Sequence, residues 1–278
     1  MEDRIQEQVE YTKINGEVTR ARESVVRETG LSIYINKKHY TTVMMSALME
    51  RELVTGYLFG QGLIYSIEEL ESIYIEGNAA RVTVKDAHRI SQRIKKSDYR
   101  IVSGGGLSAF SDGTGLPRIQ TRMKIGKEEI FRAMNTVFEK AEIYKATEGT
   151  HAAGLFTPEA TTICIAEDIG RHNTLDKVIG YALINKIDLS NTFLASTGRM
   201  ASEMVTKLCR AGIPVVATKA AVTKSALEIG QKCGLTIIGF VRDKGTRLNT
   251  DLGTRTIIEP GMKIYTNAGR VLGEEKAS

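Results

Sequence analysis

Basic, hydroxyl and glycine residues follow each of four predicted strands in the second half of the chain. The segments EDIGRHN, STGRMASE, TKAAVTKS and FVRDKGTR stand at the carboxyl ends of these strands. Where strands of a parallel sheet end and helices begin, free N–H groups and the helix dipole attract anions. The candidate binding residues at these ends are Asp168, Arg171, His172, Ser196, Gly198, Arg199, Phe240, Arg242, Lys244, Gly245 and Arg247.

These residue types suit a ligand that carries several phosphates and a planar ring system. A guanidinium group such as that of Arg199 can bind two phosphate oxygens at once, and Phe240 offers an aromatic face. The alternative is that all of them are solvated loop residues, because strand-to-helix loops are generally polar in α/β proteins. The pattern leaves both interpretations open, although a site at the strand ends is the default hypothesis for this architecture.

Three groups at the first strand end could also take part in proton transfer, and each has a structural alternative. Glu167 and Asp168 could act as acid or base, although adjacent carboxylates more often cap a turn or pair with a nearby arginine. His172 could serve as a base or a ligand. A single histidine after a strand more often makes a structural hydrogen bond.

The segment IVSGGGLSAFSDGTG, residues 101–115, is rich in glycine and serine, and Asp112 is its one charged residue. Basic residues precede and follow it, among them Arg100 and Arg118. Its composition is typical of a flexible linker, and a glycine-rich loop can also surround a phosphate group with its backbone N–H groups. The segment by itself does not distinguish these two roles.

Composition places the chain among ordinary globular proteins. Its 278 residues are 42% apolar and 26% charged, which suffices for a sizeable core in one large or two smaller domains. A net charge of +5 and a pI of about 9.0 permit an acidic or phosphorylated partner. Because the chain has no Trp and no dense stripe of Lys and Arg, a nucleic-acid partner is not expected.

The cysteines and the lengths of the apolar runs indicate the cellular compartment in which the protein is expected. Cys164, Cys209 and Cys233 form neither a disulfide pattern nor a zinc-ligand spacing, so we expect a reducing cytoplasm and no metal site. Each has apolar neighbours, which is typical of inert core thiols. The polar start of the sequence predicts no signal peptide. No apolar run reaches the length of a membrane span, so we expect a cytoplasmic protein without a membrane partner.

The first hundred residues read as a small α+β unit that begins with a polar strand or arm over residues 1–28. Apolar alternation in GLSIYINKKHY predicts a hairpin that turns at residues 36–38. SALMERELVTGYLFGQG has the spacing of a helix, for which Ser46 is the expected N-cap. SIYIEGNAARVTV predicts a second hairpin that turns at residues 77–78.

In the second half of the chain, predicted strands and helices alternate as they do in an α/β fold. KEEIFRAMNTVFEKAEIY predicts a helix with one apolar face, and HAAGLFTPEATTICIAED predicts a strand, a turn and a strand. Strands and helices then alternate as β-α-β-α-β-α-β, with Asn173 as the expected cap of the first helix, so we expect an α/β fold with a largely parallel sheet. The expected parts are a small α+β part over 1–100, the glycine-rich loop and connection over 101–125, and the α/β domain over 126–278.

Three segments resemble the formate dehydrogenase accessory protein (FdhD) family. EDIGRHNTLDKVIGYAL, STGRMASEMVTKLCRAGIPVV and LTIIGFVR occur in the family's order and at its spacing. The likeness is close over residues 151–250 and looser in the first half, where LVTGYLFGQGLI is similar to the family's helix-and-glycine signature. The first two segments are specific, and a chance match of both in this order is not expected.

The resemblance implies a larger part similar to cytidine deaminases, a smaller α+β part, and a homodimer. It implies no deaminase chemistry, and the chain lacks the H-x-E and C-x-x-C zinc ligands of those enzymes. Known members accept sulfur as a persulfide from a cysteine desulfurase and deliver it to the molybdenum bis(molybdopterin guanine dinucleotide) cofactor of formate dehydrogenase. The stretch that contacts this cofactor matches residues 240–245, which adds Val241 and Asp243 to the candidates and makes GDP a possible surrogate ligand.

The same resemblance gives residues 101–115 a further interpretation besides that of a plain linker. Family members have a C-G-x-C-G cysteine pair in this loop, whereas this chain has Ser103 and Gly106 at the matching positions. Persulfide formation needs an ionised sulfur nucleophile, which neither residue can supply. The loop is therefore interpreted as a family loop without its nucleophile, and sulfur transfer through the usual cysteine is not expected.

Three functions remain as hypotheses. The leading one is an accessory protein that binds the molybdenum cofactor, or its guanine-nucleotide portion, and helps formate dehydrogenase to mature. The second keeps sulfur transfer from a cysteine desulfurase, either through another thiol of this chain or through a persulfide that a partner supplies. The third is a nucleotide-acting enzyme on a deaminase-like scaffold, with Glu167 or His172 as its base.

Overall fold

The computed structural model describes residues 4–96, 99–101, 107–109, 113–243, 246–249 and 255–273. Its helices are α1 (Glu50–Gly60), α2 (Ala87–Lys96), α3 (Lys127–Lys140), α4 (Glu142–Thr147), α5 (Arg171–Ile184), α6 (Ser202–Ala211) and α7 (Lys224–Cys233). Its strands are β1 (Gln6–Ile14), β2 (Val18–Val26), β3 (Thr29–Ile35), β4 (Lys38–Met45), β5 (Leu70–Glu76), β6 (Ala79–Val84), β7 (Tyr99–Ile101), β8 (Leu107–Ala109), β9 (Ile125–Gly126), β10 (His151–Phe156), β11 (Thr162–Asp168), β12 (Phe193–Ser196), β13 (Val215–Thr218), β14 (Thr236–Arg242), β15 (Thr246–Asn249), β16 (Arg255–Ile258), β17 (Gly261–Thr266) and β18 (Val271–Leu272).

The larger sheet has six strands within the described residues, in the order β11-β10-β12-β13-β14-β17. β12, β13 and β14 pair in parallel, whereas β10 is antiparallel to both of its neighbours and β17 is antiparallel to β14. The expectation of a largely parallel sheet therefore needs correction, because the sheet is mixed. The tight turn after β10 places β11 at the edge, and α5 then passes β10 to reach β12. β11, β12, β13 and β14 still end at one common edge.

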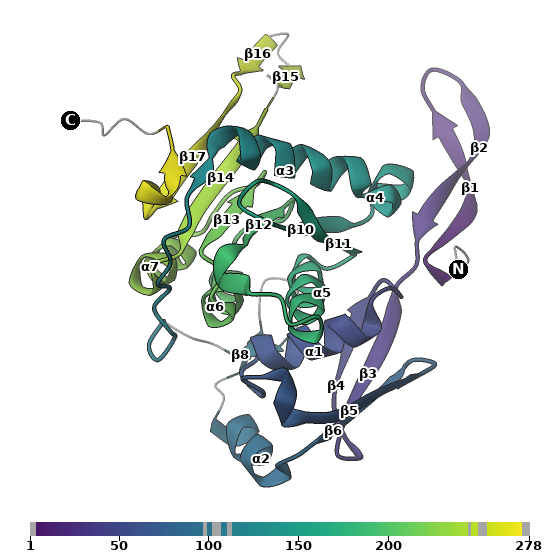
Figure 1. The fold of residues 1–278 in the computed structure, drawn as a ribbon. Coiled ribbons are helices and arrows are strands. Elements are labelled where there is room, and N and C mark those ends of the chain that lie inside the picture. The colour runs from purple at the N-terminus through teal and green to yellow at the C-terminus, as the bar shows by residue number, and fades with distance from the viewer. Residues whose placement is uncertain are drawn as a thin grey trace.

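Helices cover both faces of this sheet, which gives three layers (Figure 1). On one face, α3 packs its apolar residues Ile130, Met134 and Val137 among buried strand residues that include Phe156 and Phe193. This confirms the predicted apolar face of that helix. On the other face, α5, α6 and α7 enclose a second apolar cluster. The sheet is thus buried on both sides, and its edges and strand ends remain as surface for a site.

The N-terminal unit is a four-stranded sheet in the order β4-β3-β6-β5, with α1 beside it (Figure 1). Leu31, Ile33 and Ile35 on β3 are all buried, as their alternation predicts. Asn36 and Lys37 form the turn between β3 and β4 with φ angles of 46° and 70°, the left-handed conformation of a two-residue hairpin turn. Both hairpins predicted for this unit are therefore confirmed.

Helix α1 joins the two parts of the molecule by packing directly on α5. At Gly56 the backbones approach so closely that a Cβ atom would lie 1.8 Å from the carbonyl oxygen of Asp176. Gly180 on α5 makes the reciprocal contact, since its Cβ would lie 1.9 Å from the carbonyl oxygen of Glu52. One apolar cluster continues from the four-stranded sheet through α1 to α5, α6 and α7. The two parts share a core, and the domain boundary near residue 100 stays a prediction.

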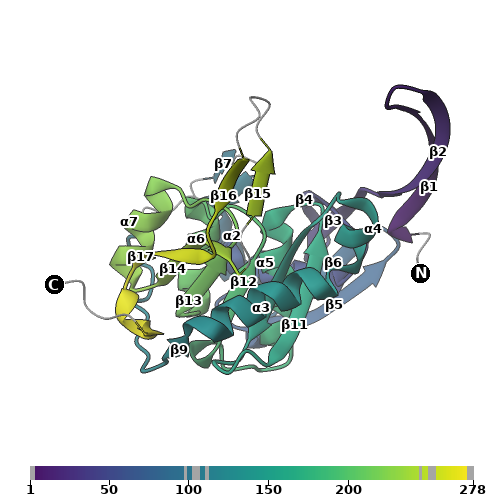
Figure 2. The ribbon, with the colours of Figure 1, turned by 90° about the horizontal axis from the view of Figure 1, so that it is seen from above.

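Two hairpins project from the same side of the body (Figure 2). β1 and β2 form a long antiparallel ribbon, which agrees with the predicted polar arm, and its tip exposes Ile14 and Val18. β15 and β16 form the second hairpin, which follows β14 in the chain. In the part of the chain that the structure describes, no helix is long and apolar enough to span a membrane.

Candidate functional site

The carboxyl ends of β11, β12, β13 and β14 form one edge of the larger sheet, which we call the rim. His151, the first residue of antiparallel β10, belongs to the rim because it pairs with Asp168 at the end of β11. The loops after β12 and β13 are tied together by backbone hydrogen bonds, from Met200 N–H to the Ala221 carbonyl and from Thr223 N–H to the Met200 carbonyl, both 3.0 Å. These bonds hold the loops after β12 and β13 side by side at the rim.

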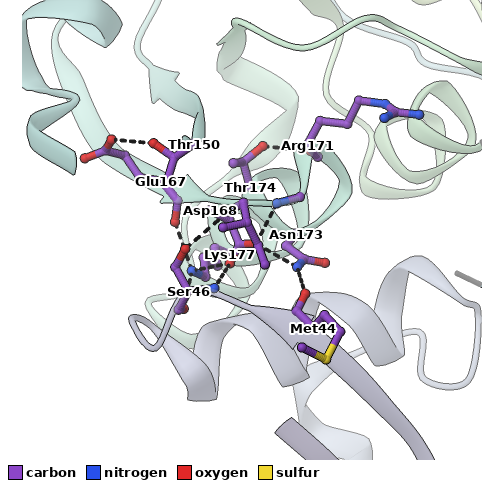
Figure 3. A network of polar contacts seen from close by, with 11 residues as sticks. Met44, Ser46, Thr150, Glu167, Asp168, Arg171, Asn173, Thr174 and Lys177 are labelled. Atoms are coloured by element: carbon purple, nitrogen blue, oxygen red, sulfur yellow. Dashed lines mark hydrogen bonds and ion pairs between the residues drawn. The ribbon is translucent and has the colours of Figure 1, made fainter. Parts of the chain in front are cut away.

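Four basic side chains gather where β10, β11 and β12 meet the rim, and we call His151, Arg171, His172 and Arg199 the His–Arg cluster. Arg171 extends away from the buried side chains beneath it (Figure 3). Its Cβ lies so near the backbone of Gly198 that a Cβ added there would be 2.8 Å away. Glycine at 198 thus lets Arg171 pass close to the loop that carries Arg199. The structure thus brings the predicted residues Arg171, His172 and Arg199 to one end of the rim, together with His151.

The charges in the His–Arg cluster repel one another. Burial, and then the nearby Arg199, lower the pKa of Arg171. Burial, followed by Arg171 and His172, also lowers the pKa of His151, while Asp168 acts in the opposite direction. Burial lowers the pKa of His172 as well. These shifts favour the neutral form of both imidazoles, and a bound anion would relieve the repulsion between the two arginines.

Glu203 on α6 fixes the ring of His172. The His172 Nε2 atom lies 2.9 Å from Glu203 Oε1, and the two side chains are 17% and 10% exposed. The hydroxyl of Ser202 donates to the other carboxylate oxygen at 3.0 Å. The hydrogen bond with His172 is the main cause that lowers the pKa of Glu203 to about 2. Glu203 therefore remains a carboxylate at any working pH and orients His172 toward the rim.

Asp168 is buried and ties the first rim loop to the N-terminal unit (Figure 3). Its Oδ2 atom lies 2.6 Å from Lys177 Nζ, and both side chains are 0% exposed. The backbone N–H of Ser46 donates to Oδ2 at 3.1 Å, and that of Gly170 donates to Oδ1 at 2.9 Å. The amide of Asn173 also donates to Oδ1, at 2.8 Å. The carboxylate is thus paired with a cation and hydrogen-bonded, as a buried charge must be.

This network explains two local differences from the sequence predictions. Ser46 does not cap α1, because its hydroxyl accepts from the N–H of Ile169 at 3.2 Å. Asn173 lies inside α5 rather than at its cap, and its amide also donates to the Met44 carbonyl at 2.8 Å. Both side chains join segments that are far apart in sequence. Asp168 has no exposed surface for a ligand, so its part in the site is to position the loop.

Glu167 likewise holds structure together. It accepts hydrogen bonds from the backbone N–H groups of Ile143 (3.0 Å) and Tyr144 (2.7 Å) at the start of α4. The hydroxyl of Thr150 donates to it at 3.2 Å. A carboxylate at a helix N-terminus satisfies donors that have no partner within the helix and complements the helix dipole. These contacts make Glu167 a cap and give no support to a role as catalytic base.

Hydroxyl groups shape the loop after β12. Ser196 is buried, and its Oγ atom accepts from the N–H of Gly198 at 3.1 Å. Thr218, at the end of β13, donates its hydroxyl to the Gly198 carbonyl at 2.7 Å. The glycine is therefore held from both sides by neighbouring strands. Ser196 supports the loop from beneath, and Arg199 is the residue of this loop that reaches the His–Arg cluster.

The far end of the rim carries an aromatic ring between cations. Phe240 has a left-handed backbone, with φ at 55°, a conformation that costs a non-glycine residue about 1–3 kcal/mol and is often found at functional sites. Lys263 Nζ lies 4.8 Å and Arg242 Cζ 5.8 Å from the ring centroid. Val241 is buried in the core beneath α3, and Asp243 accepts a hydrogen bond from an α3 side chain at 2.8 Å. Phe240 and Arg242 are the half-buried members of this group.

The predicted binding residues thus fall into two groups rather than one. β11 and β14 are four strand positions apart in the sheet, which corresponds to about 19 Å. Arg171, His172, Gly198 and Arg199 lie at one end of the rim, and Phe240 and Arg242 lie at the other. Ser103, Gly106, Lys244 and Gly245 lie outside the described residues, and Arg247 is described as a backbone position of β15.

The three cysteines are free thiols buried in the core. Burial is the main cause that raises the pKa of Cys164 to about 12. Burial also raises the pKa of Cys209, and the neighbouring Cys233 thiol adds to this effect. Because the thiolate is the nucleophile, a buried neutral thiol reacts slowly. The prediction of inert core thiols agrees with this placement.

We expect an aromatic disulfide reagent such as Ellman's reagent to leave all three thiols of the native protein unlabelled over minutes. In concentrated guanidinium chloride, the same reagent should titrate three thiols per chain, because unfolding exposes all of them to the reagent. The absorbance of the aromatic thiolate that the reagent releases measures how many thiols react in the native and in the unfolded protein. A thiol that titrates at once in the native protein would contradict the burial described here.

His151 is the member of the cluster that the sequence analysis missed. A histidine at the start of a strand carries no local signal of a site. Only the strand pairing places His151 in the site. Because β10 runs antiparallel to β11, β10 begins at the edge where β11 ends, and His151 is its first residue. A cavity of about 720 Å³ lies elsewhere, at the base of the β1–β2 arm, with Arg4, Glu50 and Asn78 in its lining. It contains none of the predicted binding residues.

Comparison with known proteins agrees with this architecture. The family model described as the FdhD/NarQ family matches residues 26–272. A sulfur carrier protein FdhD from Wolinella succinogenes is 30% identical over 275 residues, which cover 97% of this chain and 90% of that protein. Another, from Saccharolobus solfataricus, is 34% identical over 76% of this chain and 81% of its own length.

A solved structure has the same fold. The crystal structure of a formate dehydrogenase accessory protein from Desulfotalea psychrophila superposes with a TM-score of 0.75 over 96% of this chain and all of that chain, at 21% sequence identity. The family match includes the N-terminal four-stranded sheet, α1 and the whole rim. The family resemblance found in the sequence is therefore confirmed, and the chain belongs to the FdhD/NarQ family.

Proposed function

We propose that this protein is an accessory factor for formate dehydrogenase maturation that binds the guanine-nucleotide portion of the molybdenum bis(molybdopterin guanine dinucleotide) cofactor at the rim. The relatives' names, sulfur carrier protein and formate dehydrogenase accessory protein, support the biological setting. The His–Arg cluster supports the binding role. Formate dehydrogenase is the proposed client, and the cofactor is cargo that passes through the protein.

The observation that carries the proposal is the gathering of four basic side chains, His151, Arg171, His172 and Arg199, at one strand-end site. Arg171 and the two histidines have lowered pKa values because burial and neighbouring cations act together. Glu203 is the carboxylate that contacts His172. A diphosphate group would bring negative charge beside Arg171 and Arg199, and guanidinium groups bind phosphate oxygens in matched pairs. The aromatic ring of Phe240, at the far end of the rim, suits a planar part of the same large ligand.

The test is a calorimetric titration of the purified protein with GDP. We expect saturable binding, and we expect Arg199→Ala to weaken it by about 10- to 100-fold, because one charge-assisted hydrogen bond contributes about 1.5–3 kcal/mol. Arg20→Ala, which removes an exposed arginine from the β1–β2 arm, is the matched control and should bind as the parent does. No heat of binding at millimolar GDP in a folded sample would contradict the proposal.

Sulfur transfer is a separate question, because the relatives are named sulfur carriers while Ser103 and Gly106 occupy the family's cysteine positions. Among the described residues the thiols are buried, which favours a cofactor-binding chaperone whose sulfur comes from another protein. Incubation with a cysteine desulfurase and labelled cysteine tests this. Label that is lost on Cys→Ala substitution would show that this chain carries sulfur itself.

Three finer points belong to the same proposal. We propose a homodimer in the cytoplasm, in line with the family resemblance, and light scattering would measure the oligomer directly.

We also propose that the three-layer part shares the cytidine deaminase arrangement without its chemistry, since the zinc-ligand motifs are absent from the sequence. A nucleotide-acting enzyme remains the alternative, and turnover of cytidine or guanosine nucleotides by the protein would favour it.

A further inference from the structure

His151 presents one ring nitrogen to solvent beside the two rim arginines. The hydroxyl of Thr197 accepts from the N–H of Ala152 at 3.0 Å, so its proton is free to point at His151 Nδ1, 3.5 Å away. The neutral tautomer in which Nε2 carries the proton fits this arrangement, because the Thr197 hydroxyl can then donate to Nδ1. Among the described residues Nε2 has no hydrogen-bond partner, and it is not one of the buried unsatisfied atoms. Its N–H is therefore available to a ligand.

The charged groups around His151 come from every element packed against it. Arg171 and His172 stand on α5, Arg199 stands on the loop after β12, and Asp168 stands on β11. The arginines and His172 disfavour a proton on His151, and Asp168 favours one. Asp168 is already paired with Lys177 at 2.6 Å. Burial is the largest cause that lowers the pKa of His151 and the arginines add to it, so an anion that neutralises the arginines makes a proton on the ring more favourable.

We propose that His151 contacts the bound phosphate and takes up a proton when the phosphate binds. Through this proton uptake, His151 makes the rim prefer a dianionic phosphate. Its Nε2–H donates to an oxygen of the phosphate that Arg171 and Arg199 hold, and the ring takes up a proton at Nδ1 as that phosphate binds. The Thr197 hydroxyl then accepts from Nδ1–H in place of donating to it. This inference rests on the proposed function, because it names how the same site recognises a dianionic phosphate.

The direction in which phosphate affinity changes with pH follows from the linkage between proton binding and ligand binding. Without ligand, the pKa of His151 lies below its usual value of 6.5. A bound dianion raises it, so the complex binds more protons than the free protein between the two pKa values. Affinity for a phosphate ligand must therefore rise as the pH falls through this window. A shift of about one unit corresponds to about a tenfold change in affinity.

The experiment compares the wild-type protein, His151→Gln and His88→Gln by calorimetric titration with GDP at pH 7.5 and pH 5.5, values chosen to span the usual histidine pKa of about 6.5. Glutamine keeps an N–H donor but does not titrate. GDP titrates too, and the ratio of wild-type to variant affinity removes that contribution. We expect this ratio to increase about tenfold at the lower pH for His151→Gln and to stay constant for His88→Gln, an exposed histidine on α2.

A second readout follows the His151 ring protons by NMR in the wild-type protein, with and without GDP, and we expect GDP to raise the midpoint of the titration. Tight binding with the same pH dependence in wild type and His151→Gln would overturn the inference, because His172 or the ligand would then account for it. The proposed function would stand in that case. Absence of GDP binding to folded wild-type protein at either pH would overturn the proposed function and this inference with it.

Discussion

Gly56→Ala is expected to destabilise the protein by about 3 kcal/mol or more, as measured by urea unfolding. The added methyl group would lie 1.8 Å from the Asp176 carbonyl oxygen and 2.6 Å from its carbonyl carbon. Both atoms belong to the backbone of α5, so no side chain can move aside, and α1 must shift away from α5. Because one apolar cluster spans α1, the four-stranded sheet and α5, a shift of α1 opens the core of the whole molecule.

Gly261→Ala provides the matched control. Gly261 lies in β17, where an added Cβ meets nothing within 4 Å and the backbone needs no left-handed conformation. The same chemical change should therefore have little effect on the unfolding midpoint. If Gly56→Ala unfolded at the same urea concentration as Gly261→Ala, the close approach of α1 and α5 described here would be contradicted.

Lys177→Met is expected to destabilise the protein by about 3–5 kcal/mol, because it leaves the Asp168 carboxylate buried without its cation. The ion pair has a 2.6 Å separation and no exposed surface. Lys177 also donates to the carbonyls of Ser46 (3.1 Å) and Glu167 (2.9 Å), so its loss frees both segments. The loop that carries Arg171 should lose its fixed position, and GDP affinity should fall together with stability. Urea unfolding and GDP titration measure the two effects.

Two further variants separate the buried charge from a general effect of losing lysine. Lys224→Met breaks a surface pair with Glu228, 3.8 Å apart, in which the lysine is 90% exposed, and exposed pairs of this kind contribute little. Asp168→Asn combined with Lys177→Met removes both charges and keeps an acceptor for the N–H groups, so it should recover part of the lost stability. Equal stability of Lys177→Met and Lys224→Met would argue against an essential ion pair.

Features that depend on neighbours in sequence could be predicted. The hairpin turn at Asn36 and Lys37 and the apolar face of α3 follow from local patterns. Gly212 and Gly234, which follow α6 and α7 directly, both adopt the left-handed conformation that ends a helix. These signals act over a few residues, so they can be recognised without knowledge of the fold.

Features that depend on distant pairing could not be predicted in the same way. The alternation of strands and helices gives the order of elements, but it does not reveal that β10 lies between β11 and β12. Ser46 and Asn173 both look like helix caps because their side chains suit that role. In the structure, Ser46 instead meets the loop after β11, and its N–H reaches Asp168 across 122 positions of sequence. No local pattern encodes such a partner.

The candidate site could be predicted in part. Arg171, His172 and Arg199 meet because the strands that precede them end at one edge, which follows from parallel topology. The burial of Asp168 and Ser196 could not be foreseen, because a polar residue at a strand end looks the same whether it faces solvent or supports a loop. His151 enters the site through the antiparallel strand β10, and no pattern in the sequence indicated a functional role for that strand.

Crystals of the protein soaked with GDP would show by diffraction whether the rim binds a guanine-bearing polyphosphate. We expect phosphate density within hydrogen-bonding distance of the Arg171 and Arg199 guanidinium groups, with His151 Nε2 facing the same oxygens. Phosphate density at the cavity beside Arg4 and Glu50, or anywhere else away from the His–Arg cluster, would contradict it.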